Sequence, residues 1–300
     1  MMPQLCDTAG MNIEDSSAPQ GAVEVRTLLR EARLRLQGEE AAREAELLLM
    51  YVLGVTRAWL FAHADEAVAE GEAQRFRVLV QQRVEGQPVA YLLGEREFFG
   101  LRLKVSPATL IPRPETELLV ELALQSLPRR AGLRVLDLGT GSGSIALALA
   151  HARPELEVCA SDASAAALAV ARANAESLGL ARLRFQLGSW WLPWAGQRFD
   201  LVLSNPPYIE DADPHLGAGD LRFEPRSALA SGADGFDDIR AIVSAASAHL
   251  QPGGWLLFEH GHAQGEGSRQ LLQLAGFSEV GTWQDLEARD RVSGGRWLQT

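Results

Sequence analysis

The alternation of short apolar strands with helical stretches after Gly132 constrains the fold more than any other feature of the sequence. The expected strand RVLDL leads into the glycine-rich stretch GTGSGS and the apolar helix IALALAHA, and strands keep alternating with helices beyond it. Such alternation joins parallel strands through helical crossovers, which cover both faces of the sheet. Two last strands, near residues 277–283 and 291–299, have no helix between them and predict an antiparallel edge hairpin. We therefore predict an α/β domain with a Rossmann-like, doubly wound and mostly parallel sheet.

The part of the chain before this domain has a different period. In residues 22–87 apolar residues recur at three- and four-residue steps, which predicts a small all-α domain. Residues 88–114 contain the alternating stretch EREFFGLRLKVS and the proline-rich PATLIPRP, which are typical of a hairpin and a linker. Residues 1–21 mix Ser, Pro, Gly and acids without periodicity, so we expect a disordered leader there. The α/β domain then takes residues 115–300.

Composition and charge exclude several classes of protein. The 300 residues are 47% hydrophobic and 22% charged, as in ordinary globular domains, and this length fits two domains better than one. No stretch approaches the ~20 apolar residues of a membrane span. Cys6 and Cys159 are the only cysteines, too few for a disulfide framework or a zinc cluster. The low cysteine count fits a reducing cytoplasm, which is where we expect the protein. The net charge of -11 opposes attraction to phosphates, so we expect no direct contact with nucleic acid, and we expect none with a membrane.

The glycine-rich loop predicts a cofactor site. Ligands of open α/β sheets bind at the carboxyl ends of strands, and glycines let the backbone approach them closely. The spacing Gly141-x-Gly143-x-x-Ala146 also matches a dinucleotide fingerprint. Asp137 precedes the loop, however, and would repel a pyrophosphate but attract the ammonium and sulfonium of S-adenosylmethionine. The predicted cofactor-binding residues here are Asp137, Gly139, Thr140, Gly141, Ser142 and Gly143.

Two further positions are expected to contact the nucleoside part of the cofactor. Asp162 ends the next strand, LEVCASD, where it can accept hydrogen bonds from both ribose hydroxyls of either cofactor. It can instead cap the following helix, although Ser164 is equally able to do so. Trp190 and Trp191 follow the third strand and offer an apolar wall for an adenine, although tryptophans more often pack in a core.

The tetrapeptide Asn205-Pro206-Pro207-Tyr208 follows the strand FDLVLS and is the most informative motif. A planar amide or arylamine nitrogen is a poor nucleophile, so a site that methylates one must hold its N–H groups with acceptors. Asn205 supplies a side-chain carbonyl, Pro206 a backbone carbonyl, and Pro207 fixes the turn that aims it. Tyr208 offers a face on which a flat group can stack. We predict catalysis by orientation and desolvation, with Asn205 also next to the cofactor and with no covalent intermediate or metal.

Other candidate residues have simpler explanations. Glu259, His260 and His262 are of the types that bind metals, but no further His or Cys stands at a zinc-like spacing. Arg113 and Glu115 in IPRPETE can pair with each other or cap the helix that follows. We therefore predict no metal site, and the IPRPETE segment by itself does not indicate a function.

Taken together, DLGTGSG, Asp162 and NPPY with the flanking EFFG, PRPETE, FEPRSAL and EHG resemble the HemK or PrmC family of protein-(glutamine) methyltransferases. The likeness extends from about Val23 to the C-terminus. It implies methyl transfer from S-adenosylmethionine to the side-chain amide nitrogen of the glutamine in the Gly-Gly-Gln loop of class-1 peptide chain release factors. It also implies that residues 139–143 hold the methionine part of the cofactor, Asp162 the ribose and Trp190 the adenine region, while residues 205–208 hold the glutamine amide.

The same resemblance implies how the protein substrate is bound. Phe99, Arg113 and Glu115 would belong to the cleft through which the Gly-Gly-Gln loop enters, and the N-terminal helices resemble a substrate-docking domain. Ser189 departs from the family pattern, because many relatives carry an acid there and could bind the adenine amino group with it. We expect a monomer that meets release factors as substrates.

Three alternatives remain open from the sequence. A glutamine methyltransferase of a ribosomal protein would share the mechanism and differ in what the helical domain recognises. An adenine-amino methyltransferase of DNA or RNA would need a flipped base and a basic track, which the acidic balance opposes. A non-catalytic cofactor-binding module would have no need for the intact residues 205–208.

Overall fold

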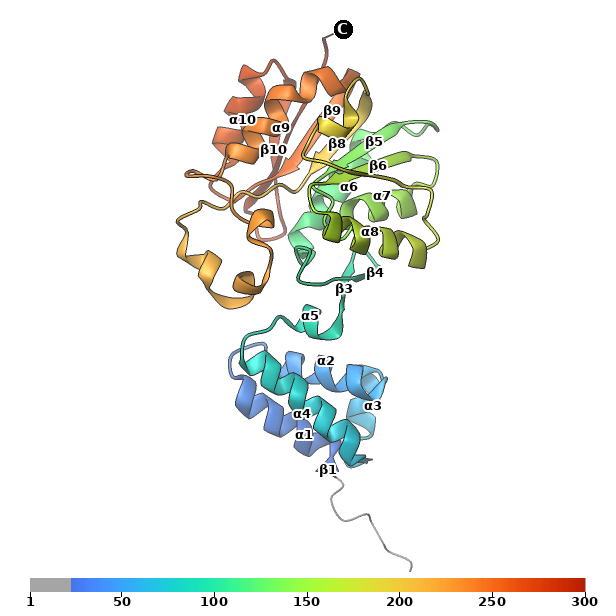
Figure 1. Ribbon diagram of the computed structural model, residues 1–300, viewed down its shortest axis with the longest axis vertical. Coiled ribbons are helices and arrows are strands. Elements are labelled where there is room, and N and C mark those ends of the chain that lie inside the picture. The colour runs from blue at the N-terminus through green and yellow to red at the C-terminus, as the bar shows by residue number, and fades with distance from the viewer. Residues whose placement is uncertain (1–22, 300) are drawn as a thin grey trace, which may run out of the picture. The chain divides into compact units, whose positions relative to one another are not determined.

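The computed structural model describes residues 23–299, drawn in colour in Figure 1. The leader expected over residues 1–21 lies outside this range. Contacts divide the chain into two compact units, with the boundary between Glu85 and Gly86. Each unit is described by itself.

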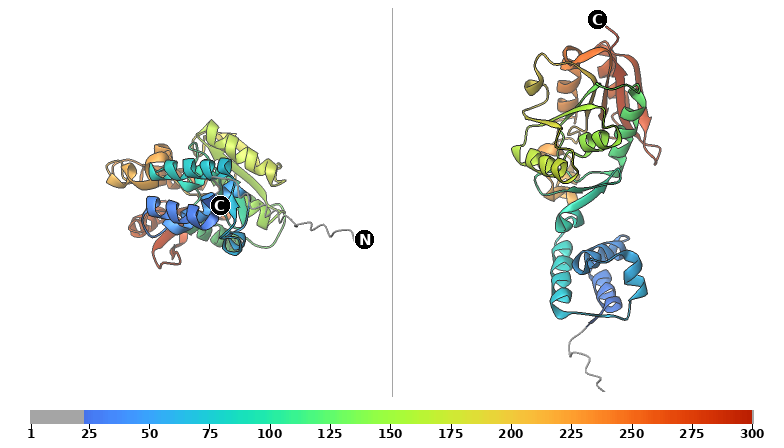
Figure 2. Two further views of the ribbon diagram at one scale, coloured as in Figure 1. Left: turned by 90° about the horizontal axis from the view of Figure 1, so that it is seen from below. Right: turned by 90° about the vertical axis from the view of Figure 1, so that its right-hand side faces the viewer.

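The first unit is helical. Its helices are α1 (Val25–Leu36), α2 (Ala41–Leu53), α3 (Arg57–Ala62) and α4 (Glu70–Val84), and the short strands β1 (Val23–Glu24) and β2 (Ala67–Val68) pair antiparallel. Figure 2 shows α1, α2 and α4 packed together, as their mutual contacts require. Leu28, Leu48 and Phe76 are fully buried between them, because apolar residues spaced three and four apart share one helix face. Arg83 of α4 donates two hydrogen bonds to Glu44 of α2, at 3.0 and 2.8 Å.

The second unit is built on a seven-stranded sheet in the order β10-β11-β9-β8-β5-β6-β7. Its strands are β5 (Arg134–Leu138), β6 (Glu157–Asp162), β7 (Arg184–Leu187), β8 (Phe199–Ser204), β9 (Leu250–Glu259), β10 (Ser278–Gln284) and β11 (Asp290–Arg296). The strands from β9 to β7 in this order are parallel. Strand β11 runs antiparallel to β9 and to β10. The predicted mostly parallel sheet with an antiparallel edge hairpin is therefore confirmed.

Helices cover both faces of this sheet (Figure 1). The helices α6 (Glu117–Ser126), α7 (Ser144–Ala152) and α8 (Ala165–Ser177) share one hydrophobic core with one face, and α9 (Asp237–Ala245) and α10 (Gly265–Leu274) share another with the opposite face. Val135 of β5 belongs to the first core, whereas the next residue, Leu136, belongs to the second. Successive side chains of a strand point to opposite faces, so a strand buried on both sides is apolar throughout.

The hairpin of β3 (Glu95–Phe98) and β4 (Leu101–Lys104) lies in the second unit, together with the short helix α5 (Val89–Leu93), which the sequence did not predict. Buried Asn174 of α8 fixes the hairpin, because it accepts a hydrogen bond from Lys104 N and donates to Lys104 O, at 2.7 and 3.0 Å. Its side-chain nitrogen also donates to Ser142 O at 2.9 Å, which ties the hairpin to the glycine-rich loop. No helix within residues 23–299 is long and apolar enough to cross a membrane.

Candidate active site

A cavity of about 360 Å³ opens in the second unit at the carboxyl ends of the sheet strands. Because β6, β5 and β8 are neighbours in the sheet, the segments that follow them meet at one edge, where open α/β sheets bind ligands. The cavity is lined from the glycine-rich loop, from the segments after β6, β7 and β8, and from residues 108–116 before α6, which we call the lip. Residues 225–228 contribute Pro225, Ser227 and Ala228.

The glycine-rich loop supplies Gly139, Thr140, Gly141 and Ser142 to the cavity wall, whereas Gly143 does not line it. The N–H groups of Gly139 and Thr140 both donate to Ser161 O at 2.9 Å, so β6 holds the loop. Gly139 has a φ of 72°, and a Cβ there would lie 3.3 Å from a ring carbon of Trp190. Gly143, with a φ of 88°, begins α7, and a Cβ there would lie 2.9 Å from Leu147. A side chain at either position is therefore disfavoured by both backbone and packing.

Asp137 lies fully buried beneath this loop and does not itself line the cavity. Its Oδ2 accepts a hydrogen bond from the Thr140 hydroxyl at 2.6 Å, while Oδ1 has no partner among residues 23–299. Burial raises the pKa of Asp137 to about 7, although the bond from Thr140 acts in the opposite direction. A buried, under-satisfied carboxylate favours a positively charged group in the loop above it, so the structure fits a cationic ligand.

Asp162 ends β6 and lines the cavity. Its Oδ2 accepts from Gly141 N and its Oδ1 from Ser164 N, both at 2.8 Å. Ser164 caps α8 by accepting from Ala167 N, so Asp162 does not serve as the cap. Burial raises the pKa of Asp162. Each carboxylate oxygen has a second lone pair, and the two together can accept from two neighbouring hydroxyls of a ligand.

The two tryptophans after β7 point to different places: Trp190 to the cavity and Trp191 to the core. Trp190 lines the cavity beside Gly139, and Ser189 lines it as well. Trp191 is buried, stacks on His249 with ring centroids 4.7 Å apart, and donates its indole N–H to Ile242 O at 3.1 Å. The expectation that Trp191 also forms the apolar wall is wrong, because its indole packs into the core beside α9 and finds its hydrogen-bond acceptor there.

The NPPY residues form a turn directly after β8. Asn205 and Pro207 line the cavity, whereas Pro206 and Tyr208 do not. Asn205 Nδ2 donates to the Thr116 hydroxyl oxygen at 3.1 Å, which leaves the carboxamide oxygen to accept at the cavity. Tyr208 directs its hydroxyl to Glu259 Oε1 at 3.1 Å, and its N–H bonds Leu229 O at 3.2 Å. Burial is the main reason that the pKa of the Tyr208 hydroxyl is raised. The hydroxyl therefore stays protonated and donates to Glu259.

The lip contributes to the cavity through residues other than those the sequence singled out. Ala108, Thr109, Leu110, Pro112 and Thr116 line it. Arg113 instead forms an ion pair with buried Glu224, which also accepts from Ile111 N at 2.9 Å. Neither Arg113 nor Glu115 lines the cavity. The Arg113 guanidinium instead links the lip to the segment around Glu224.

Phe99 also lies outside the cavity wall. It stands at the turn of the β3–β4 hairpin with a φ of 50°, and its N–H donates to Glu117 Oε1 at 2.9 Å. Its ring is partly buried against the core that contains α6. Phe99, Arg113 and Glu115 therefore remain predictions as contacts of a protein substrate, at the margin of the site.

Sequence reasoning overlooked three residues of the site: Thr116, Glu224 and Glu259. The motifs PRPETE, FEPRSAL and EHG contained all three, but nothing in their spacing indicated what they would contact. Glu259 was considered only as a metal ligand. Instead its partners are two hydroxyls, and the adjacent His260 bonds Gly261 O and the Ser293 hydroxyl, both at 2.8 Å.

Comparisons with known proteins identify the family of this chain. Residues 27–94 match the PrmC N-terminal domain and residues 115–223 match the methyltransferase small domain. A release factor glutamine methyltransferase of Xylella fastidiosa is 56% identical over 253 residues, which cover 84% of this chain and 92% of that protein. One of Escherichia coli is 45% identical over 272 residues, covering 90% and 98%. A crystal structure of a methyltransferase from Pyrococcus furiosus has a TM-score of 0.51 at 19% identity, covering 67% and 91%.

The structural likeness establishes the fold alone, because it comes with only 19% identity. The sequence relatives establish the family, since the match at 56% identity extends over most of both chains. The resemblance that the motifs indicated is thereby confirmed, and this chain belongs to the family of release factor glutamine methyltransferases.

Proposed function

We propose that this protein is an enzyme that transfers a methyl group from S-adenosyl-L-methionine to the side-chain amide nitrogen of a glutamine in class-1 peptide chain release factors. The glutamine would be that of the Gly-Gly-Gln loop. The observation that carries the proposal is Asn205, whose carboxamide oxygen is left to accept at the cavity while Thr116 engages its nitrogen. Membership of the family supplies the substrate class.

The cavity has the features that this cofactor requires. S-adenosylmethionine supplies an electrophilic methyl group on a positively charged sulfur. Residues 139–143 would hold its methionine part, with the charge of Asp137 beneath them. Asp162 would accept from the ribose hydroxyls, and Trp190 would cover the adenine region. The unpartnered Oδ1 of Asp137 and the second lone pairs of Asp162 support these assignments.

The chain's own residues orient a reluctant nucleophile. The lone pair of a carboxamide nitrogen is delocalised, so its attack depends on alignment. Asn205 Oδ1, at the cavity wall, would accept from one N–H group of the glutamine. The backbone carbonyl of Pro206 would accept from the other at the edge of the cavity, since Pro206 does not line it, and Pro207 fixes the turn that aims this carbonyl. These acceptors stabilise the positive charge that develops on the nitrogen during attack, and the nitrogen then releases to solvent the proton that the methyl group replaces. The mechanism is orientation in a site shielded from water, and it forms no covalent intermediate.

Protein recognition would involve the margin of the site and the helical unit. Phe99, Arg113 and Glu115 would contact the segments around the glutamine, and the helices of residues 22–87 would dock the rest of the release factor. We place the reaction in the cytoplasm, where release factors act, and propose that the enzyme works as a monomer. A net charge of -11 gives direct nucleic-acid binding no support.

Methylation assays test this function. Purified protein is incubated with methyl-labelled S-adenosylmethionine and, in separate reactions, with a class-1 release factor, ribosomal proteins, DNA or RNA. We expect label on one glutamine of the release factor, located by mass spectrometry, and no label when the Gly-Gly-Gln glutamine is replaced. Label on a ribosomal protein or on adenine alone would contradict the proposal in favour of those substrates.

A further inference from the structure

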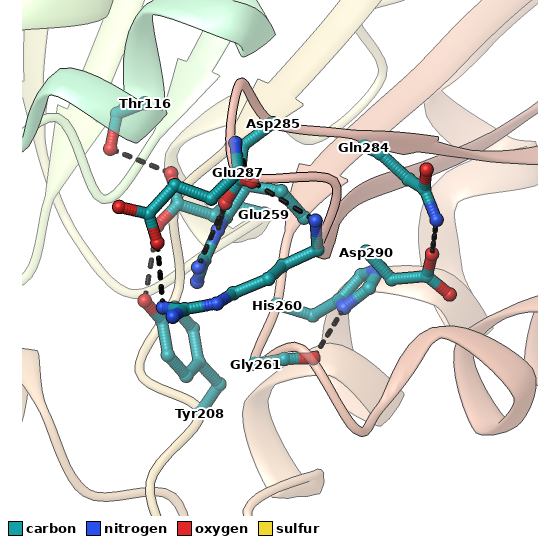
Figure 3. Close-up of polar contacts among 11 residues, drawn as sticks. Thr116, Tyr208, Glu259, His260, Gly261, Gln284, Asp285, Glu287 and Asp290 are labelled. Carbon is teal, nitrogen blue, oxygen red and sulfur yellow. Dashed lines mark hydrogen bonds and ion pairs between the residues drawn. The ribbon is translucent and has the colours of Figure 1, made fainter.

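Glu259 is a buried carboxylate that the mechanism above does not use. It ends β9, is 1% exposed, and its two oxygens accept from Thr116 at 2.6 Å and from Tyr208 at 3.1 Å (Figure 3). Burying a carboxylate costs free energy, and an amide or an apolar side chain would avoid most of that cost. Arg291 lies near enough for its charge to compensate in part, although it pairs directly with Asp285. A carboxylate at this costly position differs from an amide in one respect that matters here: when ionised it can only accept hydrogen bonds.

The bond from Thr116 to Glu259 determines which way the Thr116 hydroxyl points. Burial raises the pKa of Glu259, whereas the hydrogen bonds from Thr116 and Tyr208 and the charge of Arg291 act against this rise. In its ionised form the carboxylate can only accept, so Thr116 donates its single proton to Glu259. Its oxygen is then limited to accepting, and Asn205 Nδ2 donates to it at 3.1 Å. The two ends of a carboxamide have nearly the same shape, so these hydrogen bonds decide its orientation.

We propose that Glu259 is a positioning residue that, through Thr116, holds the Asn205 carboxamide with its oxygen toward the substrate amide. This inference rests on the proposed function. The three residues come from β9, from the start of α6 and from the turn after β8, and the bond of Tyr208 to the second oxygen of Glu259 fixes the far end of the same turn. If the carboxamide were reversed, it would present N–H groups to the N–H groups of the glutamine.

The test is Glu259→Gln, which keeps the shape of the side chain. A glutamine has one donor end and one acceptor end. When its NH₂ faces Thr116, the Thr116 proton is free to bond the Asn205 oxygen, so the orientation of the Asn205 carboxamide is no longer enforced. We expect kcat for release-factor methylation to fall at least about tenfold, with the Kd for S-adenosylmethionine and the melting temperature unchanged. Asp200→Asn is the matched control, because Asp200 accepts from Arg134 N near the opposite end of β8 and should leave kcat unchanged.

Thr116→Val breaks the hydrogen bonds that join Glu259 to Asn205, and it does not alter the buried carboxylate. It should reproduce the loss of kcat, Thr116→Ser should recover most of it, and the Thr116→Val/Glu259→Gln double variant should be no slower than either single variant. Additive losses, or Thr116→Val and Glu259→Gln enzymes that are both within twofold of wild type, would overturn the inference.

A readout without substrate separates this inference from the proposed function. The Asn205 side-chain NH₂ signal, assigned in the NMR spectrum by its absence in Asn205→Ala, should exchange slowly in the wild-type protein and faster in Glu259→Gln. An unchanged exchange rate would overturn the positioning role even if no release factor were methylated. Failure of the wild-type enzyme to methylate a release factor, with the change in exchange still observed, would instead overturn the proposed substrate.

Discussion

Two parts of the site are assembled in different ways: the part that we propose binds the cofactor, around Asp137 and Asp162, and the part that we propose binds the substrate, around Asn205. We call them the cofactor half and the substrate half. In the cofactor half, Asp137 bonds Thr140 three residues away and Asp162 bonds Gly141 across 21 residues. In the substrate half, Asn205 bonds Thr116 across 89 residues and Thr116 bonds Glu259 across 143. The first half is a product of strand order and local turns, whereas the second depends on side chains delivered by distant segments.

This difference indicates which property a substitution in each half should change. The cofactor half relies largely on backbone groups, such as the N–H groups of Gly139 and Thr140 that bond Ser161 O. The substrate half relies on hydroxyl, carboxamide and carboxylate groups in series, where loss of one partner leaves the next unsatisfied. Substitutions in the substrate half should therefore reduce turnover, and substitutions in the cofactor half should reduce cofactor affinity.

The largest effect is expected for Asn205→Ala. Removing the preorganised acceptor should raise the activation free energy by about 2–4 kcal/mol, a loss of about 30- to 900-fold in kcat. Cofactor affinity measured by calorimetry should stay near that of the wild-type protein, because the contacts of Asp162 remain. Retained turnover would show that the amide is not held by this residue.

Asp162→Ala should produce the converse result in the cofactor half. Loss of charge-assisted hydrogen bonds to the ribose should weaken S-adenosylmethionine binding by about 1.5–3 kcal/mol, measured by calorimetry. Thr56→Ala is the control, because Thr56 caps α3 by accepting from Trp59 N and does not line the cavity; its loss should cost about 1 kcal/mol in folding stability and leave cofactor binding unchanged. Equal Kd values for the Asp162→Ala and wild-type proteins would remove the ribose assignment.

The same difference explains what the sequence could predict. The mostly parallel sheet with its edge hairpin and the glycine-rich loop follow from hydrophobic period and glycine position, which are local properties. NPPY was predicted to be an amide-holding turn because its residue types already contain the chemistry, and the structure places Asn205 and Pro207 at the cavity. The Thr116–Glu259 bond could not be predicted, since one threonine and one glutamate 143 residues apart have no signature before the chain is folded.

Trp191 and Arg113 show a second limit of sequence reasoning. A position beside the site does not determine the direction of a side chain. Trp191 follows Trp190 directly, yet its indole is buried against His249. Arg113 belongs to the lip, yet its guanidinium pairs with Glu224. Both directions are set by partners far away in the sequence.

The pH dependence of cofactor binding should distinguish the two halves again. The pKa of Asp137 is raised to about 7, so its ionised fraction falls from about 0.9 at pH 8 to about 0.1 at pH 6. Because a cation prefers the ionised form, cofactor affinity should weaken about tenfold between these values, and Asp137→Asn should lack this dependence on Asp137. Calorimetry across this range checks it, and identical pH profiles for the two proteins would contradict the role of the charge.

The raised pKa also has a consequence for the cofactor-free protein. Between pH 4 and 7 the folded Asp137 retains a proton that the unfolded chain has released, so folding stability from this group decreases as the pH rises through that window. The melting temperature of wild-type protein should therefore decrease relative to that of Asp137→Asn over the same window. A constant difference between the two proteins would mean that Asp137 is ionised throughout.

The smallest effect is expected for Glu224→Gln, which acts at the margin of the substrate half. Glu224 receives hydrogen bonds from two donors, Ile111 N and the Arg113 guanidinium, so the amide NH₂ of a glutamine would face one of them unfavourably. A looser lip should raise the KM for the release factor by about threefold while kcat and the cofactor Kd stay constant. Asp200→Asn disturbs one of a similar pair of bonds, from Arg134 N and Arg130, and should leave KM unchanged. A fall in kcat for Glu224→Gln would instead mean that the lip acts on the reacting amide itself, through Thr116.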